Sequence, residues 1–304
     1  MIAAGSGVVR RARVARIETN FIQLSSGGSA VDDVAGRTVF ITGGARGIGL
    51  GIARAFAREG ASLALADVDG EALAAAREQV SGAAGVELFE LDVRDRAAFE
   101  RVADEAEQRL GPVSVLCNNA GIRVRDPLPE LSYELWDLVM GVNLEGVYNG
   151  VQTFLPRMLE RGTTGHIVNT SSAAGLAIHP NSRQAGSSGI TYRSAKSAVI
   201  GLSEALRFDL EAGGHSIGVS VLCPGLVSTN ISSNSAAIAH LPAEQQRLAE
   251  RGDAVLAQLG QDPDVVGTMV LDAVRADRLY VHTDRSMIDA VTERAARLLD
   301  AMPT

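Results

Sequence analysis

The amino-acid sequence predicts an α/β fold, with a single domain built on a doubly wound parallel sheet that carries helices on both faces. Short apolar runs rich in β-branched residues alternate with longer amphipathic segments from residue 37 onward. This alternation is typical of right-handed strand–helix–strand crossovers, which produce a parallel sheet covered on both sides. No linker divides the pattern, and 46% hydrophobic residues in a chain of 304 are sufficient for one large core.

The alternation places the elements in order. About seven strands are expected, near residues 37–42, 62–67, 86–91, 113–118, 165–171, 216–223 and 279–283. The longest helical pattern runs from Tyr133 to Glu160, and Pro156 is expected to kink or end its last turns. A further helix contains Tyr192 and continues to about Leu210, and residues 287–299 form a final amphipathic helix.

Composition and charge exclude several classes of function. The 36 acidic and 28 basic side chains give a net charge of −8, which disfavours nucleic acid or an anionic membrane as a partner. No apolar run reaches membrane-spanning length, so we expect a cytoplasmic protein. Cys117 and Cys223 each lie in an apolar run and are interpreted as core thiols, and the five histidines show no zinc spacing. No metal site is predicted.

Residues 1–35 differ from the rest of the chain. Four arginines, from Arg10 to Arg16, precede the first acidic residue, Glu18, and a Ser/Gly-rich stretch follows. An arginine-rich, acid-poor leader could be a transit peptide. The alternative that we favour is a disordered arm or an early start codon, with the folded domain covering residues 36–304.

The first strand leads directly into a glycine-rich loop, Thr42 to Gly49, and then into a helix. Gly43 and Gly47 allow a tight turn with close backbone approach, and Gly49 lets the helix pack against its strand. The N-terminus of such a helix presents free N–H groups to a pyrophosphate. This order of strand, loop and helix predicts dinucleotide binding, whereas the glycines alone would fit a structural turn equally well.

The second strand ends in a carboxylate, Asp67, where the ribose of adenosine should lie. Asp67 should accept hydrogen bonds from the ribose hydroxyls of NAD and repel the 2′-phosphate of NADP. Arg46 in the glycine loop could instead pair with that phosphate, with solvent or with Asp67. We expect NAD rather than NADP. Asp67 could also cap the helix that begins near Gly70, although Asp69 is better placed to do so.

Tyr192 and Lys196 lie four residues apart, on one face of the same helix. A free tyrosine titrates near ~10, and Lys196 is placed to supply the cation that favours its phenolate. Tyr192 is therefore a candidate general acid/base. By itself, the spacing would also fit an exposed helical pair.

Two further positions carry polar groups in chemically suggestive places. Ser171 and Ser172 follow the strand that ends at Thr170, and a hydroxyl at the carboxyl end of a parallel strand can donate to a bound substrate. They could also be ordinary capping residues. Asn143 lies in an apolar helix, where a buried amide must find hydrogen-bond partners.

Three segments together resemble the classical short-chain dehydrogenase/reductase family: Thr42 to Gly49, Leu91-Asp92-Val93, and Cys117-Asn118-Asn119-Ala120-Gly121. The resemblance covers roughly residues 36–302 and implies a Rossmann-like domain. It also implies a catalytic tetrad of Asn143, Ser172, Tyr192 and Lys196. In this family the serine orients the substrate, the lysine keeps the phenol acidic and binds the ribose, and the asparagine supports a water relay to the lysine.

The same resemblance implies a cofactor cleft. Asp92 and Val93 would contact the adenine, and the residues after Pro224 would hold the nicotinamide side, with Thr229 binding carboxamide or phosphate. The complete expected cofactor-binding set is Gly43, Arg46, Gly47, Ile48, Gly49, Asp67, Asp92, Val93, Asn119, Ala120, Gly121, Tyr192, Lys196, Pro224, Gly225, Val227 and Thr229.

Phrases such as Gly141–Val147 and Leu279-Tyr280-Val281 are similar to a branch of Cα-dehydrogenases that act on lignin-type aryl-propane alcohols. We therefore expect an NAD-dependent oxidoreductase that interconverts a secondary alcohol, bulky or aryl-bearing, and its ketone by hydride transfer. The alternatives are an NADPH-dependent carbonyl or 3-oxoacyl-type reductase and a catalytically silent dinucleotide-binding sensor. The resemblance also implies a homotetramer or homodimer.

Two segments are expected to border the substrate. Residues 226–262 mix Ser, Asn, Ala and Leu, which is typical of a mobile substrate-covering helix and loop. The segment from Leu176 to Ile190 is longer than the family usually carries and reads as a loop. This loop could be a solvated insertion, or a lip in which His179 or Gln184 contacts substrate.

Overall fold

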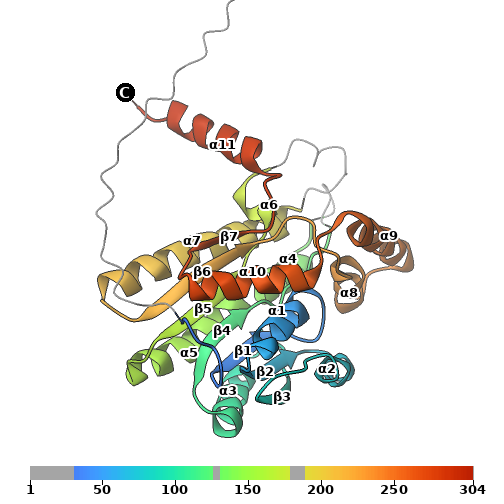
Figure 1. Ribbon diagram of the computed structural model, residues 1–304. Helices are drawn as coiled ribbons and strands as arrows, with labels where there is room; N and C mark the ends of the chain where they lie inside the picture. Colours follow the sequence, from blue (N-terminus) through green and yellow to red (C-terminus); the bar gives the residue numbers. More distant parts are fainter. Residues whose placement is uncertain (1–30, 126–130, 179–188, 304) are drawn as a thin grey trace, which may run out of the picture.

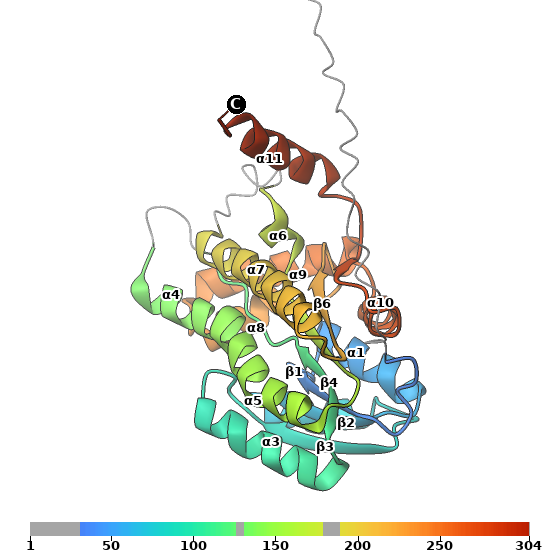
Figure 2. The same ribbon diagram turned by 90° about the vertical axis from the view of Figure 1, so that its left-hand side faces the viewer.

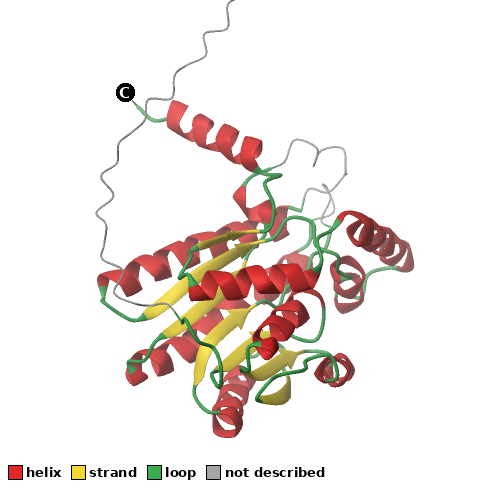
Figure 3. Cartoon of the chain, viewed as in Figure 1, coloured by secondary structure: helices red, strands yellow, loops and turns green. Residues whose placement is uncertain are grey.

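The computed structural model describes residues 31–125, 131–178 and 189–303. A seven-stranded parallel sheet runs through the domain in the order β3-β2-β1-β4-β5-β6-β7 (Figures 1 and 3). The strand order reverses between β1 and β4, the switch point at which open α/β sheets bind ligands. The strands are β1 (Thr38–Thr42), β2 (Ser62–Asp67), β3 (Gly85–Glu90), β4 (Val113–Asn118), β5 (Gly165–Thr170), β6 (Ile217–Cys223) and β7 (Tyr280–His282).

The predicted strands are confirmed, each within one residue of its expected bounds. They could be recognised because side chains on both faces of a parallel sheet are buried. Along β1, Val39 and Ile41 belong to one apolar cluster and Phe40 belongs to the other. The ring of Phe40 lies 4.8 Å from that of Phe154 and 6.0 Å from that of Phe99, measured between centroids.

Helices pack on both faces of the sheet, as the two apolar clusters show (Figure 2). One face carries α1 (Gly47–Arg58), α2 (Gly70–Arg77) and α10 (Pro263–Arg275), and the other carries α3 (Arg96–Leu110), α5 (Gly146–Arg161) and α7 (Ile190–Ala212). The remaining helices are α4 (Tyr133–Met140), α6 (Ala173–Leu176), α8 (Ile231–Ile238), α9 (Ala243–Leu259) and α11 (Ile288–Asp300).

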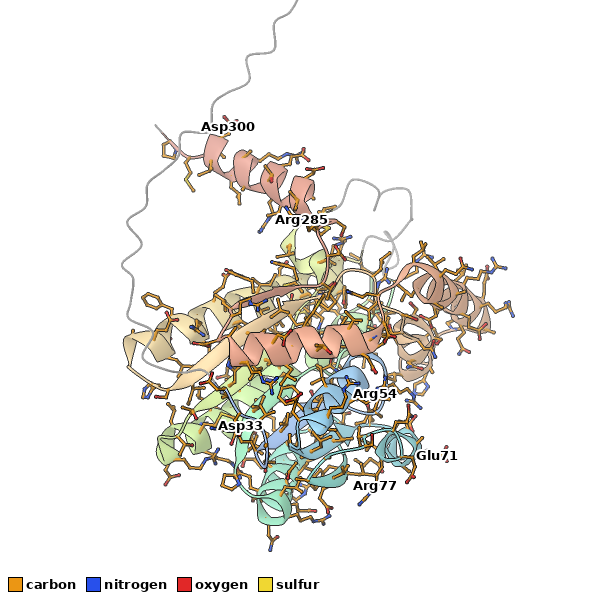
Figure 4. The ribbon with its side chains drawn as sticks, viewed as in Figure 1. Asp33, Arg54, Glu71, Arg77, Arg285 and Asp300 are labelled. Atoms are coloured by element: carbon orange, nitrogen blue, oxygen red, sulfur yellow. The ribbon has the colours of Figure 1, made fainter. Side chains whose placement is uncertain are left out.

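Two glycines bring α1 and α10 into backbone contact. A Cβ atom on Gly51 would lie 2.1 Å from the carbonyl oxygen of Pro263, and one on Gly267 would lie 2.1 Å from that of Gly51. Arg54 on α1, labelled in Figure 4, fastens the pair because its Nε donates to Asp264 Oδ1 at 2.7 Å. This contact fixes the position of α1, the helix that follows the glycine loop.

The long helix expected from Tyr133 to Glu160 is confirmed in its extent but is not uniform. A π-helical segment, η1 (Gly141–Glu145), separates α4 from α5. The expectation that Pro156 might end the helix is wrong, because α5 continues to Arg161. Phe154 and Met158 on either side of the proline are buried in the core, and this packing outweighs the single backbone hydrogen bond that proline removes.

The boundary of the N-terminal arm also needs correction. Val31 and Val34 are wholly buried in the cluster beneath α1, so the packed domain begins at least five residues before residue 36. Gly36 then donates its N–H to Gly60 O at 2.9 Å. Two isolated valines in a polar stretch carry no periodic pattern, which is why the sequence did not reveal them.

The final helix, α11, projects from the body of the domain (Figures 1 and 2). Among its residues Ala290 is buried, and Arg294 Nη1 donates to Leu176 O at 3.2 Å. His179 and Gln184 of the expected lip lie outside the described residues. No helix in the described ranges combines the length and the apolar character needed to cross a membrane.

The buried valines generate a test of the domain boundary. Deleting residues 1–35 should lower the free energy of unfolding by about 3 kcal/mol or more relative to deleting residues 1–30, since each buried valine contributes about 1.5–3 kcal/mol. Urea unfolding followed by circular dichroism measures the difference. A full-length chain carrying Val31→Ala and Val34→Ala is the matched control for the two side chains. Equal stability of the two truncated proteins would place the boundary after residue 35.

Candidate active site

The glycine loop after β1 has the backbone geometry that its sequence predicts. Gly43 and Gly47 have φ values of 63° and 51°, a region that disfavours residues with a Cβ atom. A Cβ on Gly49 would lie 2.0 Å from Gly43 O, so α1 meets the loop backbone to backbone. Ile48 lies in the first turn of α1, which packs above this loop.

The N-terminus of α1 is open to an anion. Its N-cap residue, Arg46, makes no side-chain cap hydrogen bond, whereas Asp69 and Asp95 cap α2 and α3 by accepting from backbone N–H groups. The cap assigned to Asp69 by the sequence is therefore confirmed. Uncapped N–H groups at the ligand edge of the sheet fit a pyrophosphate, the group that a dinucleotide would place there.

Asp67 ends β2 beside this loop, with its carboxylate already fixed by the backbone. Oδ2 accepts from Ala45 N and Oδ1 accepts from Asp69 N, both at 3.2 Å. Burial raises the pKa of Asp67 above its usual range, and these two hydrogen bonds act against that rise. Arg46 pairs with Asp69 at 2.6 Å rather than with Asp67.

The loop after β4 braces the glycine loop. Thr42 Oγ1 accepts from the N–H groups of Asn119 and Ala120 at 3.0 and 3.1 Å. The Asn119 side chain donates to Thr42 O and Gly43 O at 3.1 and 3.2 Å. A Cβ on Gly43 would lie 2.8 Å from Ala120 Cα, so the two loops touch directly.

A buried chain of amides connects this edge to α7. Asn118 Nδ2 donates to Asn169 Oδ1 at 2.9 Å, and Asn169 Nδ2 donates to Ser203 Oγ at 3.1 Å. The chain links β4, β5 and α7, the three elements that border the expected tetrad. Its role is to hold them in register, because none of its members reaches the surface.

Asp92 and Val93, the expected contacts of the adenine, follow β3. Asp92 is held by Arg94, whose Nη2 lies 2.6 Å from Asp92 Oδ2, and this hydrogen bond lowers the pKa of Asp92. Val93 O accepts from Asn149 Nδ2 at 2.8 Å. Arg94 was missed by the sequence analysis, although a basic residue two positions after the aspartate was a visible signal.

The segment after β6 reaches across to the glycine loop. Pro224 O accepts from Ala173 N at 2.8 Å, and Gly225 N donates to Thr283 Oγ1 at 3.0 Å. Val227 forms a bridge to Gln261. Thr229 lies against the glycine loop, since a Cβ on Gly47 would be 2.9 Å from Thr229 Cγ2.

The π-helical segment η1 presents Asn143 to the site. Asn143 Nδ2 donates to Ile122 O at 2.9 Å and to Val139 O at 3.0 Å, which satisfies the amide donors predicted to need partners. Asn143 Oδ1 has no hydrogen-bond partner among the described residues. It converges with the lysine at Gly121, because a Cβ there would lie 2.9 Å from Asn143 Oδ1 and 3.4 Å from Lys196 Nζ.

The two serines after β5 have different environments. The buried Ser171 donates its hydroxyl to Lys196 O at 2.7 Å. Ser172 caps α6 by accepting from Ala174 N at 3.1 Å, and it shares a side-chain hydrogen bond with Tyr192. Ser172 is therefore the serine that contacts the phenol.

Burial shifts the proton affinities of the tyrosine and the lysine in opposite senses. Partial burial of the Tyr192 phenol raises its pKa, and the Ser172 hydrogen bond partly offsets the rise. Burial lowers the pKa of Lys196 to about 8, since it penalises the ammonium. Lys196 Nζ donates to Thr170 O at 2.8 Å and lies 5.9 Å from the centroid of the tyrosine ring.

The charges of Arg123 and Arg193 lower the pKa of Tyr192, against the effect of burial. Arg123 comes from the loop after β4, far from the tyrosine in sequence. Only the folded chain brings it near the phenol, so no local pattern could have revealed it.

An apolar surface adjoins the phenol. Tyr192 packs against a cluster of buried residues contributed by the loop after β4 and by α4, and residues between α8 and α9 also contact it. Its principal members are Ile122, Val124, Val139, Ala239 and Leu241. We refer to these five residues as the apolar wall. Within the described ranges, no group of three or more His, Cys, Asp or Glu side chains is placed to hold a metal ion.

Comparison with known proteins agrees with this architecture. Residues 37–238 match the short chain dehydrogenase family. A C alpha-dehydrogenase of Sphingobium sp. (strain NBRC 103272 / SYK-6) is 41% identical over 208 residues, which are 67% of this chain. The chain covers 64% of that relative, less than two thirds of its length. A 1-deoxy-11-beta-hydroxypentalenate dehydrogenase of Streptomyces exfoliatus is 35% identical over 82% of this chain and 83% of its own.

A solved structure extends the agreement to three dimensions. A short chain dehydrogenase/reductase from Burkholderia phymatum, crystallised in complex with NAD, is 33% identical and superimposes with a TM-score of 0.77. The likeness covers 90% of this chain and 98% of that one. The braced glycine loop, the Ser172–Tyr192 contact and the buried lysine thus occur on a shared scaffold, and the chain belongs to the short-chain dehydrogenase family.

Proposed function

We propose that the protein is an NAD-dependent dehydrogenase that oxidises a secondary alcohol, bulky or aryl-bearing, to its ketone. The observation that carries this proposal is the hydrogen bond between Ser172 and Tyr192, with Lys196 buried beside them at the ligand edge of the sheet. The uncapped helix α1 and the carboxylate of Asp67 supply the features that a dinucleotide requires nearby.

Each residue near the phenol has a separate task. A bound nicotinamide would supply the chemistry of hydride acceptance from the carbinol carbon. Ser172 donates to the substrate oxygen, and Tyr192 as phenolate accepts the hydroxyl proton. The positive charges of Arg123 and Arg193 favour that phenolate against the effect of burial. Alcohol oxidation therefore releases one hydride and one proton, of which the protein handles the proton.

Lys196 and Asn143 are suited to pass that proton onward. The pKa of Lys196 is lowered to about 8, so its amine can exchange a proton near neutral pH. The lysine ammonium and Asn143 Oδ1 converge at Gly121, which supports the expected relay between them. The ribose of the dinucleotide would also lie within the reach of Lys196.

NAD is favoured over NADP by the backbone hydrogen bonds that hold Asp67 and by the ion pair between Arg46 and Asp69. The Asp67 carboxylate is held rigidly by Ala45 N and Asp69 N, where it would repel a 2′-phosphate. Arg46 could offset that repulsion but is paired with Asp69. The alternative of an NADPH-dependent reductase uses the same catalytic residues and is disfavoured by these two contacts.

The apolar wall supports a bulky apolar substrate. Tyr192 contacts it directly, and Leu241 and Ala239 connect it to the segment between α8 and α9. The accessible part of the wall is Ala239 and Leu241, which are partly exposed, and burying an aryl group against such apolar area is favourable by roughly 25 cal/mol per Å². The similarity to a C alpha-dehydrogenase supports the same class of alcohol.

A substrate panel tests the function. Aryl and aliphatic secondary alcohols, each assayed with NAD+ and with NADP+ by nicotinamide absorbance, should show the highest kcat/KM for aryl carbinols with NAD+.

Tyr192→Phe keeps the ring packing and removes the titrating oxygen, so it should abolish turnover while NAD+ binding, measured by calorimetry, stays near normal. Full activity of this variant, or a preference for short aliphatic alcohols, would refute the corresponding part of the proposal.

The cofactor preference has its own test. Asp67→Ser removes the repelling charge and should raise the NADP-to-NAD ratio of kcat/KM by at least about tenfold, equivalent to about 1.4 kcal/mol. Adding Asp69→Asn, which keeps the helix cap but releases Arg46, should raise it further. Asp69→Asn alone is the control. An unchanged ratio in the double variant would show that Asp67 is not the discriminator.

Lys196 is the only lysine in the sequence, which makes its pKa directly measurable. Protein labelled with [13Cε]lysine should show one side-chain resonance that titrates near pH 8, rather than near the ordinary value of 10.5. At this one group the unfolded state binds more protons than the folded state above pH 8, so the contribution of Lys196 to stability, measured as the difference from Lys196→Met, should rise from pH 8 to about 10.5. Lys196→Met should lose both the signal and this rise. A midpoint at the ordinary value would contradict the assignment.

A further inference from the structure

Arg123 is exposed at the ligand edge of the sheet, two residues after Gly121. Its neighbours on either side, Ile122 and Val124, are buried in the apolar wall, with relative exposures of 3% and 4%. The alternation turns the arginine side chain away from the wall that its neighbours build. The hydrogen bond from Arg123 N to Ser235 Oγ also places this residue beside α8, and the partly exposed wall members Ala239 and Leu241 follow that helix.

The backbone that carries Arg123 is fixed on both sides. Asn143 Nδ2 donates to Ile122 O at 2.9 Å, and Arg123 N donates to the buried Ser235 Oγ of α8 at 2.8 Å. The same stretch is thus held by a member of the expected tetrad and by a helix of the substrate-covering segment. A side chain anchored on an immobilised backbone loses less entropy when it binds a ligand.

The guanidinium of Arg123 is available. Among the described residues it forms no ion pair and no hydrogen bond, although its charge reaches both Tyr192 and Arg193. Arg193 differs, because its Nη1 lies 3.4 Å from Ala174 O and 3.3 Å from Ala177 O, which ties it to α6. The positive charges of Arg123 and Arg193 repel each other near the phenol. An anion bound beside them, next to the apolar wall, would relieve that repulsion.

We propose that Arg123 binds an oxyanion, a carboxylate or phosphate, on the substrate, while the apolar wall holds the carbon skeleton. This inference rests on the proposed alcohol dehydrogenase function and narrows its substrate to amphipathic secondary alcohols. A guanidinium presents a planar fork of N–H donors that matches a carboxylate or a phosphate in two parallel hydrogen bonds. The chain as a whole carries a net charge of −8, so the two positive charges of Arg123 and Arg193 near the phenol contrast with its overall negative charge.

Matched substrates test the proposal. The probes are 3-hydroxy-3-phenylpropanoate, its phosphonate counterpart 2-hydroxy-2-phenylethylphosphonate, and the neutral methyl 3-hydroxy-3-phenylpropanoate, each assayed with NAD+. One of the two anions should exceed the ester in kcat/KM by about 10- to 100-fold, the range of a charge-assisted hydrogen bond. Preference for the first anion identifies a carboxylate ligand, and preference for the second identifies a phosphate.

Variants assign the preference to Arg123. Arg123→Met should reduce the anion-to-ester ratio towards one, mainly through KM, and Arg123→Lys should restore part of it. Arg101→Met, which removes an exposed arginine on α3, is the control and should leave the ratio unchanged. Calorimetric titration of the enzyme–NAD+ complex with 3-oxo-3-phenylpropanoate provides a readout independent of turnover, and Arg123→Met should weaken this binding by the same factor.

The outcomes separate this inference from the proposed function. If the ester is oxidised in a Tyr192-dependent reaction and neither anion is preferred, the dehydrogenase function stands and the role of Arg123 is refuted. An equal loss of kcat/KM for the anions and the ester in Arg123→Met would also refute it. Such a result would mean that Arg123 acts on the pKa of Tyr192 and does not bind the substrate. If no alcohol of any kind is oxidised with either cofactor, the proposed function itself fails.

Discussion

The contact between the loops after β1 and β4 is the constraint on which the rest of the site depends. Thr42 and Asn119 exchange hydrogen bonds across the switch point of the sheet, and Gly43 lies against Ala120. This contact fixes the glycine loop in front of α1. It also sets the direction of the chain beyond Gly121, which then carries Ile122 to Asn143 and Arg123 to Ser235. The glycine loop, the backbone near Asn143 and helix α8 are thus positioned by one contact.

Electrostatics at the phenol follow from a competition between burial and charge. Burial raises the pKa of Tyr192 and lowers that of Lys196, so both groups are driven towards their neutral forms. The Ser172 hydrogen bond and the two arginines oppose this effect at the tyrosine. Because Arg123 and Arg193 come from different elements, the proton affinity of the phenol depends on how the β4 loop and α7 are packed.

The segments beyond residue 238 contribute unequally to the fold around the site. The match to the short chain dehydrogenase family ends at residue 238, yet α10 beyond it is part of the core and contacts α1 through Gly51 and Gly267. Gln261, which precedes α10, pairs with Val227 and so holds the segment that follows β6. In contrast, α11 contributes one buried residue, Ala290, and stands apart from the sheet.

The sequence by itself determined the strands, the sheet type, the glycine loop, the cap at Asp69 and the pairing of Tyr192 with Lys196 on one helix. These features are readable because they are local: burial on both faces makes strands uniformly apolar, and spacings of four residues define a helix face. Only the tertiary structure decided the burial of Val31 and Val34, the continuation of the helix through Pro156 and the approach of Arg123 to Tyr192. Each of these depends on packing between segments distant in sequence, and neither composition nor periodicity records such contacts.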